Sequence, residues 1–235
     1  MPPALVPQAP AALDSPETVW VFDLDNTLYP ERCNLFAHID RNMGLYISRL
    51  LKVGLAEAKR VQKEYFLTHG TTLKGLIDVH GVNPKDFLDF VHDIDLSALA
   101  EDAELKAALG ALQGRKVVFT NGSAEYAARV LGKIGIADAL DGIHDIGEGN
   151  FVPKPDPKAY HALARRFAFA PGAAVMIEDM ARNLTPAAEM GMTTVWLNTG
   201  YAYGRVGHDP RHIHYEIKAL APWLKTCAGG AHARP

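Results

Sequence analysis

The sequence predicts an α/β protein in which a parallel sheet carries helices on both faces and a helical domain is inserted after the first strand. The first observation is a set of short apolar runs of strand length, at residues 18–23, 116–120, 142–146, 173–179 and 193–198. The second is that segments with helical periodicity separate the later runs. The third is the interval of about ninety residues between the first two runs, which exceeds what one crossover helix needs. Strands that alternate with helices in this way are typical of a parallel sheet.

The strand runs are nearly continuously apolar, as in strands that are buried on both faces. The helices between the later strands are expected in SAEYAARVLGKIG, DPKAYHALARRFA and ARNLTPAAEMG. Apolar residues in these segments recur near the helical period. A further helix, AELKAALGALQ at 103–113, is expected to lead the chain back to the sheet after the insertion.

The long interval after the first strand predicts a helical cap at residues 31–100. Its helical patterns are CNLFAHIDRNMGLYISRLL, LAEAKRVQKEYFLTHG, TLKGLIDVH and NPKDFLDFVHDI. Gly54, Gly70 and Gly81 are suited to end or separate these helices. Residues 17–30 and 101–226 are then expected to form the α/β core. The Pro- and Ala-rich segment 1–16 and the tail 227–235 are expected to be flexible.

The composition is that of a soluble globular protein, with 48% apolar and 22% charged residues among 235. The net charge of −3 and the lack of a basic run argue against binding to polymeric nucleic acid. No signal peptide or membrane span is expected, and Cys33 and Cys227 form no metal-binding or disulfide pattern. A cytoplasmic protein that does not bind membranes is therefore predicted.

Two aspartates follow the first strand, in the sequence VFDLDNT. Asp23 and Asp25 are two positions apart, so in extended chain their side chains point the same way and can address one ligand. Taken alone, the pair is equally consistent with a polar turn at the end of a strand, since Asp and Asn favour turns.

Two more acids, Glu178 and Asp179, follow the apolar strand at 173–179. Alone they are better explained as residues at the start of the next helix, where negative charge is favoured. The carboxyl ends of parallel strands meet at one rim of the sheet, however, so Asp23 and Asp25 are expected nearby. Four carboxylates at one rim repel one another unless a cation lies among them, and such oxygen ligands suit Mg²⁺.

Thr120, Asn121 and Lys154 are the remaining candidates at this rim. Thr120 and Asn121 end a strand directly before a helix, and backbone N–H groups at a helix start bind anions. Lys154 lies between two prolines that hold the backbone extended. Alone, the first pair is equally consistent with a turn and helix cap, whereas the lysine is better explained as an exposed loop residue. A fixed cation beside a phosphate site is what charge balance requires.

Taken in order, these segments resemble the four motifs of the haloacid dehalogenase superfamily of phosphohydrolases. The matching residues are Asp23 to Thr27, Thr120 and Asn121, Lys154 and Pro155, and Glu178 and Asp179. The resemblance implies a Rossmann-like core, and it identifies the insertion with the cap that follows the first motif in that superfamily. DLDNTLYP, THGTTLKGL and EDMARNLTPAAEMGMTTVWL are similar to the pyrimidine 5′-nucleotidase group. Met180 departs from the pattern, because a serine is common at that position.

The resemblance implies a role for each matched residue. Asp23 is expected to attack phosphorus and form an aspartyl-phosphate, with Asp25 as general acid and base. The residues expected to hold Mg²⁺ are Asp23, Asp25 through its backbone carbonyl, Glu178 and Asp179. Those expected to bind the phosphoryl group are Leu24 and Asn121 through their backbone N–H groups, Thr120 and Lys154. Thr27 and Asn183 are expected to orient carboxylates without themselves binding the metal or the phosphoryl group. Thr27 would orient Asp25, and Asn183 would orient Glu178 and Asp179.

The expected activity is thus Mg²⁺-dependent hydrolysis of a small phosphomonoester, with UMP and CMP as the expected substrates. The residues that could face a nucleobase are Tyr29, His38, Arg41, Thr71 and Thr72, although nothing in the sequence establishes such a contact. A phosphatase for another metabolite, such as a sugar phosphate or phosphoglycolate, is the alternative, and a mutase uses similar first motifs. From a different class, the chain could be a binding module for phosphate ligands without turnover. Retention of both Asp23 and Asp25 argues against that module, because a binder needs neither nucleophile nor proton carrier.

Overall fold

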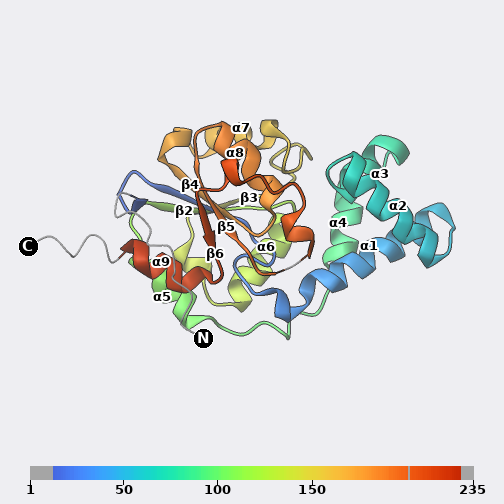
Figure 1. Cartoon of the computed structure of the whole chain (residues 1–235). Coiled ribbons are helices and arrows are strands. Elements are labelled where there is room, and N and C mark those ends of the chain that lie inside the picture. Colours follow the sequence, from blue (N-terminus) through green and yellow to red (C-terminus); the bar gives the residue numbers. More distant parts are fainter. Residues whose placement is uncertain (1–12, 201, 229–235) are drawn as a thin grey trace, which may run out of the picture.

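A computed structural model describes residues 13–200 and 202–228 (Figure 1). Its sheet has six parallel strands in the order β3-β2-β1-β4-β5-β6. The strands are β1 (Val19–Phe22), β2 (Arg115–Phe119), β3 (Gly142–His144), β4 (Ala174–Glu178), β5 (Thr193–Leu197) and β6 (Tyr215–Ile217). The predicted α/β class with a parallel sheet is confirmed.

Strand β1 lies at the centre of the sheet, between β2 and β4. Phe22 at its end is in register with Val118 of β2 and Ile177 of β4. All four residues of β1 are buried, which explains its unbroken apolar sequence. The chain order of the strands reverses at β1, and ligands of open α/β sheets bind beyond the carboxyl ends of strands at such a point.

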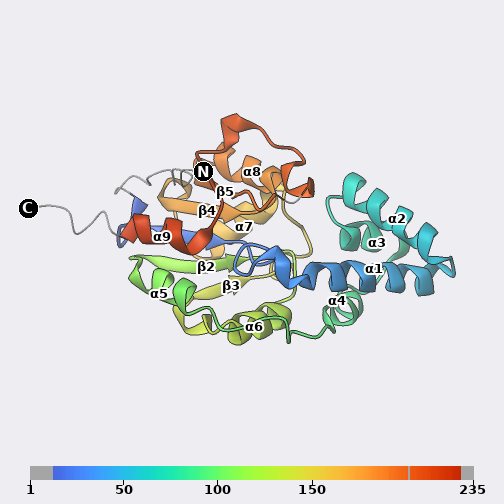
Figure 2. The ribbon, with the colours of Figure 1, turned by 60° about the horizontal axis from the view of Figure 1, so that its bottom comes forward.

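Helices cover both faces of the sheet (Figure 2). One face packs on α5 (Ala103–Ala111), α6 (Ala124–Lys133) and α9 (Leu220–Ala228), with Trp20 and Phe22 of β1 turned toward them. The other packs on α7 (Pro157–Arg166) and α8 (Leu184–Glu189), with Val19 and Val21 turned that way. This alternation follows from the two-residue period of a strand.

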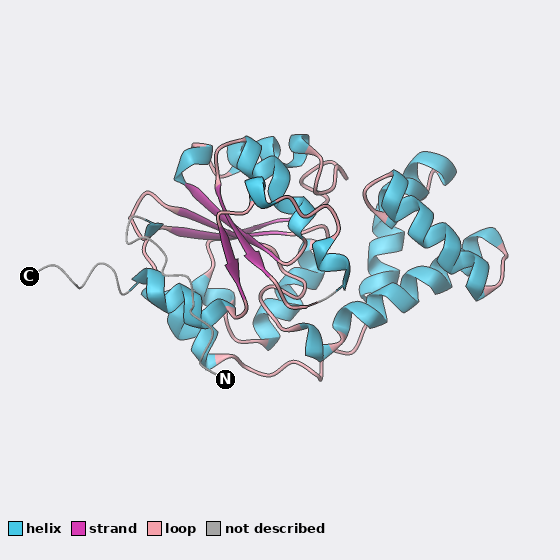
Figure 3. Cartoon of the chain, viewed as in Figure 1, coloured by secondary structure: helices cyan, strands magenta, loops and turns pink. Residues whose placement is uncertain are grey.

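The cap consists of helices and lies to one side of the sheet, beyond its carboxyl end (Figures 1 and 3). Its helices are α1 (Leu35–Leu51), α2 (Leu55–Thr68), α3 (Thr72–His80) and α4 (Pro84–His92). Side chains of Thr71 and Asn83 cap the starts of α3 and α4, and Gly81 ends α3 with a φ of 61°. That left-handed conformation suits glycine, which has no Cβ to clash.

Short 3₁₀ turns connect several elements. They are Glu31–Cys33, Ala137–Ala139, Pro171–Ala173, Ala181–Asn183, Ala202–Arg205 and Pro210–His212. Among the residues that the structure describes, no helix has the length and apolar content to cross a membrane.

Both ends of the described chain contain more structure than the sequence predicts. In the segment 1–16, residues 1–12 lie outside the described residues, but the buried Asp14 accepts a hydrogen bond of 2.7 Å from the backbone N–H of Gln113. At the other end, Cys227 of the expected tail is fully buried in α9, and residues 229–235 are not described. Leu13 and Ala228 also pack against the core.

Strand β6 is absent from the strands expected from the sequence. It pairs with β5 and is preceded by the histidine-rich segment, in which Nδ1 of His214 accepts a hydrogen bond of 3.0 Å from the backbone N–H of Thr194. His214 is itself exposed to solvent, and its hydrogen bond fastens the segment to the sheet.

Candidate active site

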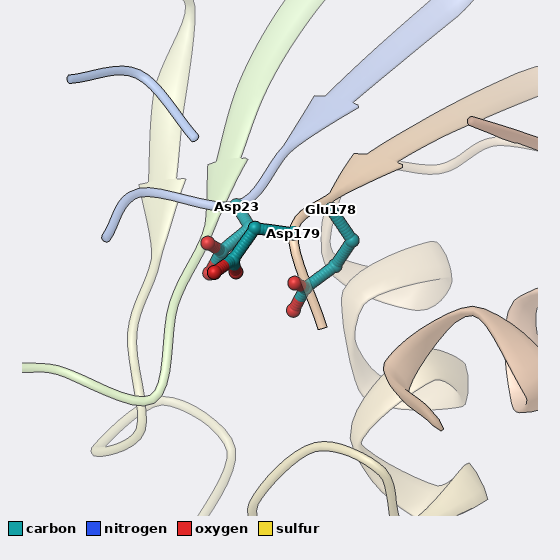
Figure 4. A group of neighbouring side chains, drawn as sticks. All are labelled: Asp23, Glu178 and Asp179. Atoms are coloured by element: carbon teal, nitrogen blue, oxygen red, sulfur yellow. The ribbon is translucent and has the colours of Figure 1, made fainter. Parts of the chain in front are cut away.

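The predicted acidic residues meet at the carboxyl ends of β1 and β4. Asp23 follows β1, Glu178 ends β4 and Asp179 comes next. Each offers a carboxylate oxygen that lies within 4.8 Å of the other two, and all three residues are buried. Figure 4 shows the carboxylates of Asp23 and Asp179 gathered at one place, with that of Glu178 alongside.

The electrostatics of this cluster fit a bound cation. Burial, followed by repulsion from Glu178, raises the pKa of Asp23 above its usual range. Burial and then repulsion from Glu178 and Asp23 raise the pKa of Asp179 well above its usual range. A divalent ion such as Mg²⁺, which prefers carboxylate oxygens, would reverse both shifts. The donor set of Asp23, Glu178 and Asp179 therefore fits Mg²⁺.

Lys154 is the cation that the described chain itself supplies. Its Nζ donates to Asp23 Oδ1 at 2.7 Å, to Glu178 Oε1 at 2.9 Å and to the Phe119 carbonyl at 2.8 Å. Its side chain is only 1% exposed. Burial alone lowers the pKa of Lys154, but the carboxylates of Asp23 and Glu178 raise it above its ordinary value, so the ammonium stays charged.

The loop that carries Lys154 is fastened to the end of β2 by Asn121. Asn121 Oδ1 accepts from the backbone N–H of Lys154 at 2.8 Å, and Asn121 Nδ2 donates to the Lys154 carbonyl at 3.2 Å. Beside it, the Thr120 hydroxyl accepts a hydrogen bond of 2.9 Å from the backbone N–H of Gly122. Both motif residues thus lie at the predicted rim, and Thr120 is buried.

Glu178 has hydrogen bonds on both carboxylate oxygens. Oε1 accepts from Asn183 Nδ2 at 2.5 Å as well as from Lys154, and Oε2 accepts from the Met180 backbone N–H at 2.8 Å. Burial raises the pKa of Glu178, but Lys154 and these donors bring it below its usual range, so Glu178 is ionised. Asn183 was expected to orient the acids, and it contacts Glu178. Met180 makes this contact through its backbone N–H, so the contact does not require a serine at position 180.

Thr27 contacts a different acid from the one expected. Its hydroxyl donates to Asp23 Oδ2 at 3.0 Å, so the expectation that Thr27 orients Asp25 is wrong. The reason is the turn after β1, in which Asn26 has a φ of 63° and the Thr27 N–H bonds the Leu24 carbonyl. The turn brings Thr27 back over Asp23. Leu24, between the two aspartates, has a fully buried side chain.

Asp25 is instead held by two tyrosines. Its Oδ1 accepts from the Tyr29 hydroxyl at 2.6 Å and from the Tyr126 hydroxyl at 2.9 Å. Burial raises the pKa of Asp25, and these two donors oppose that shift. Tyr29 was noted from the sequence only as a residue that could face a nucleobase. Tyr126 was missed, because it is 101 residues from Asp25 and a tyrosine within an amphipathic helix indicates only burial.

The cap contacts the core on two sides of this rim. On one side, Arg182 donates to the Gly70 carbonyl at 3.0 Å, and its guanidinium lies 4.0 Å from the ring centroid of Phe66. On the other, Arg129 of α6 donates to the carbonyls of His92 and Ile94, both at 3.1 Å, where the cap ends. These contacts place the cap over the edge of the sheet where the acids gather.

Other cap residues considered for a nucleobase contact are occupied elsewhere or exposed. Thr71 caps α3, and the buried Thr72 donates to the Gln62 carbonyl at 3.3 Å. His38 and Arg41 are exposed on α1.

Comparison with known proteins places this geometry in a family. Residues 18–191 match the model of the haloacid dehalogenase-like hydrolases, a stretch that includes every candidate site residue named above. The chain is 30% identical over 197 residues to "Phosphate metabolism protein 8" of Saccharomyces cerevisiae. That alignment covers 76% of this chain and 61% of the yeast protein, so the chain spans about three fifths of its relative's length.

Solved structures support the fold. A HAD phosphatase from Thermococcus onnurineus superposes with a TM-score of 0.60 at 22% identity, covering 91% of this chain and 98% of the other. A predicted phosphoglycolate phosphatase from Haemophilus somnus gives 0.59 at 17% identity, covering 90% and 98%. The parallel sheet, the rim of acids around Lys154 and the family match over residues 18–191 together mean that this chain belongs to the haloacid dehalogenase-like hydrolases.

Proposed function

We propose that this chain is a Mg²⁺-dependent phosphatase that hydrolyses small phosphomonoesters through an aspartyl-phosphate on Asp23. The observation that carries the proposal is the environment of Asp23. This carboxylate is buried, held by Thr27 at one oxygen and Lys154 at the other, and adjoins two further acids. A nucleophile fixed in this way needs little reorganisation before it reacts.

In the first step, an Asp23 oxygen attacks phosphorus while the bond from phosphorus to the leaving oxygen breaks. Asp25, in its protonated form, gives its proton to that oxygen, so the leaving group departs as an alcohol. In the second step, Asp25 takes a proton from a water molecule that attacks the phosphorus. The bond between phosphorus and Asp23 breaks, inorganic phosphate is released and both aspartates return to their starting state.

Lys154 offsets negative charge on the nucleophile Asp23 and on the phosphoryl group that it attacks. It is already bonded to Asp23 and Glu178, and Thr120 and the backbone N–H groups of Leu24 and Asn121 are assigned to the phosphoryl oxygens. Mg²⁺, held by Asp23, Asp179, the backbone carbonyl of Asp25 and Glu178, would reduce repulsion between the anionic nucleophile and the phosphate. Glu178 is the weakest of these ligands, because its oxygens already accept hydrogen bonds.

For the substrate, we propose pyrimidine nucleoside 5′-monophosphates such as UMP and CMP. The support is the similarity of DLDNTLYP, THGTTLKGL and the segment from Glu178 to the pyrimidine 5′-nucleotidase group. The second of these segments includes Gly70, which contacts Arg182 beside the acids. The cap segment that is similar to the pyrimidine 5′-nucleotidase group thus lies next to the acids, where the leaving group of a substrate would lie.

The test is phosphate release with Mg²⁺ across pyrimidine and purine nucleoside monophosphates, sugar phosphates and phosphoglycolate. The proposal expects turnover, with UMP and CMP preferred, and expects Asp23→Asn to abolish it while the circular dichroism spectrum stays that of the folded wild type. Asp138→Asn, at an exposed position away from the rim, is the matched control and should retain activity. A preference for another compound would replace the substrate but keep the reaction. Absence of turnover on the whole panel would favour a binding module instead.

A further inference from the structure

We propose that Tyr29 and Tyr126 are positioning residues that hold Asp25 by one oxygen and leave the other to carry its proton, and that His92 fixes Tyr126 from the end of the cap. The proposal rests on the proposed function, because it concerns how Asp25 meets the leaving group. It adds a dependence of proton transfer on the place where the cap rejoins the core.

The asymmetry of the Asp25 carboxylate is the central observation. Both tyrosine hydroxyls reach the same atom, Oδ1, at 2.6 Å and 2.9 Å, and they lie 3.2 Å from each other. No residue in the described part of the chain donates a hydrogen bond to Oδ2. One oxygen is therefore anchored, and the other is available to hold a proton and face a substrate.

The two donors come from different parts of the fold. Tyr29 lies four residues after Asp25 on the loop that leaves β1, and Tyr126 lies in the first turn of α6. Both tyrosines are almost fully buried, with 2% and 1% exposure, whereas Asp25 is half-buried. Two rigid buried groups thus fix a carboxylate that would otherwise rotate about its side-chain bonds. For a proton donor this matters, since a displacement of about 1 Å can reduce a rate by up to about a hundredfold.

His92 connects this arrangement to the cap. It is the last residue of α4, and its ring stacks on that of Tyr126 with centroids 4.3 Å apart and planes at 6°. Its Nδ1 lies 3.2 Å from the Ser123 hydroxyl, and its carbonyl accepts from Arg129. The position of Tyr126, and through it that of Asp25, therefore depends on the end of the cap remaining in place.

A merely structural role for the tyrosines would affect all substrates alike, whereas a positioning role depends on the leaving group. p-Nitrophenolate leaves without a proton, but the alkoxide of a nucleotide or sugar phosphate needs one. Misplacement of Asp25 should therefore slow the alkyl esters selectively. The rate of leaving-group release in the first turnover, measured by rapid quench, isolates this step from the later hydrolysis of the aspartyl-phosphate.

The variants are Tyr29→Phe and Tyr126→Phe, which remove only the hydroxyls, with Asp25→Asn as the reference for loss of the acid. For the preferred alkyl phosphomonoester we expect each tyrosine variant to lower the first-turnover rate about tenfold, less than Asp25→Asn, with KM changed less than about twofold. For p-nitrophenyl phosphate that rate should stay within about twofold of wild type. Tyr215→Phe is the matched control. It removes a hydroxyl at the start of β6, away from the rim, and should change neither rate.

His92 is tested by a pair of variants. His92→Ala removes the stacked ring, so it should show the same selective loss for the alkyl ester. His92→Phe keeps an aromatic ring on Tyr126 and should restore the rate. If both variants behave as wild type, the dependence on the cap is wrong, although the role of the tyrosines stands.

The outcomes separate this proposal from the proposed function. If Asp25→Asn is selective for alkyl esters and the tyrosine variants match wild type, the function stands and the positioning pair is refuted. Equal losses on both substrates, or a change in KM alone, also refute it. If wild type releases no phosphate from any compound, both proposals fail. Unfolding temperatures identify a variant that is misfolded. If either Tyr29→Phe or Tyr126→Phe is misfolded, the other variant still tests the positioning role.

Discussion

Asn121 and Lys154 are joined in both directions, because the side chain of Asn121 bonds both the backbone N–H and the carbonyl of Lys154. The residue whose backbone is held at both its N–H and its carbonyl is thus also the one whose ammonium contacts the acids. The lysine does not reach Asp23 from a free loop. Its stem is fixed at the base by the end of β2, and its tip by Asp23, Glu178 and the Phe119 carbonyl.

Replacing Lys154 by methionine should destabilise the protein strongly. The change keeps most of the apolar stem of the side chain but leaves buried carboxylates without their partner, and breaking a buried pair in this way costs roughly 3–5 kcal/mol. Urea unfolding in EDTA measures the loss. Lys158→Met, at an exposed position on α7, should change the free energy of unfolding by less than about 0.5 kcal/mol. A small loss for both variants would show that the acids do not need the lysine.

Mg²⁺ should stabilise the folded protein as well as support activity. A ligand that binds only the folded state raises its stability, and the ion would relieve repulsion between Asp23 and Asp179. We expect a higher unfolding temperature in MgCl₂ than in EDTA and no activity in EDTA. Asp179→Asn should abolish the increase, while Asp138→Asn should retain it. An unchanged increase in Asp179→Asn would place the ion elsewhere.

Arg182→Met should weaken closure of the cap. It removes the hydrogen bond to the Gly70 carbonyl and the contact with the Phe66 ring. Such contacts together contribute about 1–2 kcal/mol, so KM for a nucleotide should rise about tenfold while kcat changes less. Arg205→Met is the control, since Arg205 lies over Trp196 of the core instead of the cap. A fall in kcat at constant KM would assign Arg182 to the chemical step.

His144 should make stability fall as the solution becomes acidic. Burial, followed by repulsion from Arg166, lowers the pKa of His144 from 6.5 to about 4. Glu148 and Asp145 also face it. Glu148 Oε2 lies 3.5 Å from its Nδ1, but neither ring nitrogen has a hydrogen-bond partner among the described residues. The unfolded chain takes up a proton below about pH 6.5 and the folded chain does not, so stability is lost between pH 6.5 and 4.

Urea unfolding at pH 7.5 and 5 tests this dependence. His144→Phe should have a smaller difference between the two conditions than wild type, because the phenyl ring cannot be protonated. Some difference should remain, since burial also lowers the pKa of His92 to about 4. His161→Phe, on the exposed face of α7, should behave as wild type. An equal pH dependence in wild type and His144→Phe would contradict the assignment.

The features that the sequence predicts are those encoded in contiguous residues. Five strands and the main helices follow from apolar runs and periodicity, and each acidic or basic motif follows directly from a strand or lies between prolines. The rim is predictable because parallel strands bring their carboxyl ends together. Strand β6 is not, because its three residues include the exposed Glu216 and give no apolar run.

The contacts around Asp25 have no signal in the sequence. Thr27 is nearer to Asp25 along the chain, yet the turn at Asn26 directs it to Asp23. Tyr126 reaches Asp25 only after β2 has paired with β1 and α6 has packed on the sheet. Such partners depend on tertiary packing, which patterns of single residues do not specify.

The two junctions of the cap set a limit on exchanging it for another. The chain leaves the core through Tyr29 and returns through His92, and both residues contact the group around Asp25. A chimaera joined inside these two positions would replace the cap surface and keep the contacts around Asp25 in place. One joined outside them alters substrate choice and chemistry together. New specificities should therefore be grafted between Pro30 and Val91, with the aromatic residues at either end left unchanged.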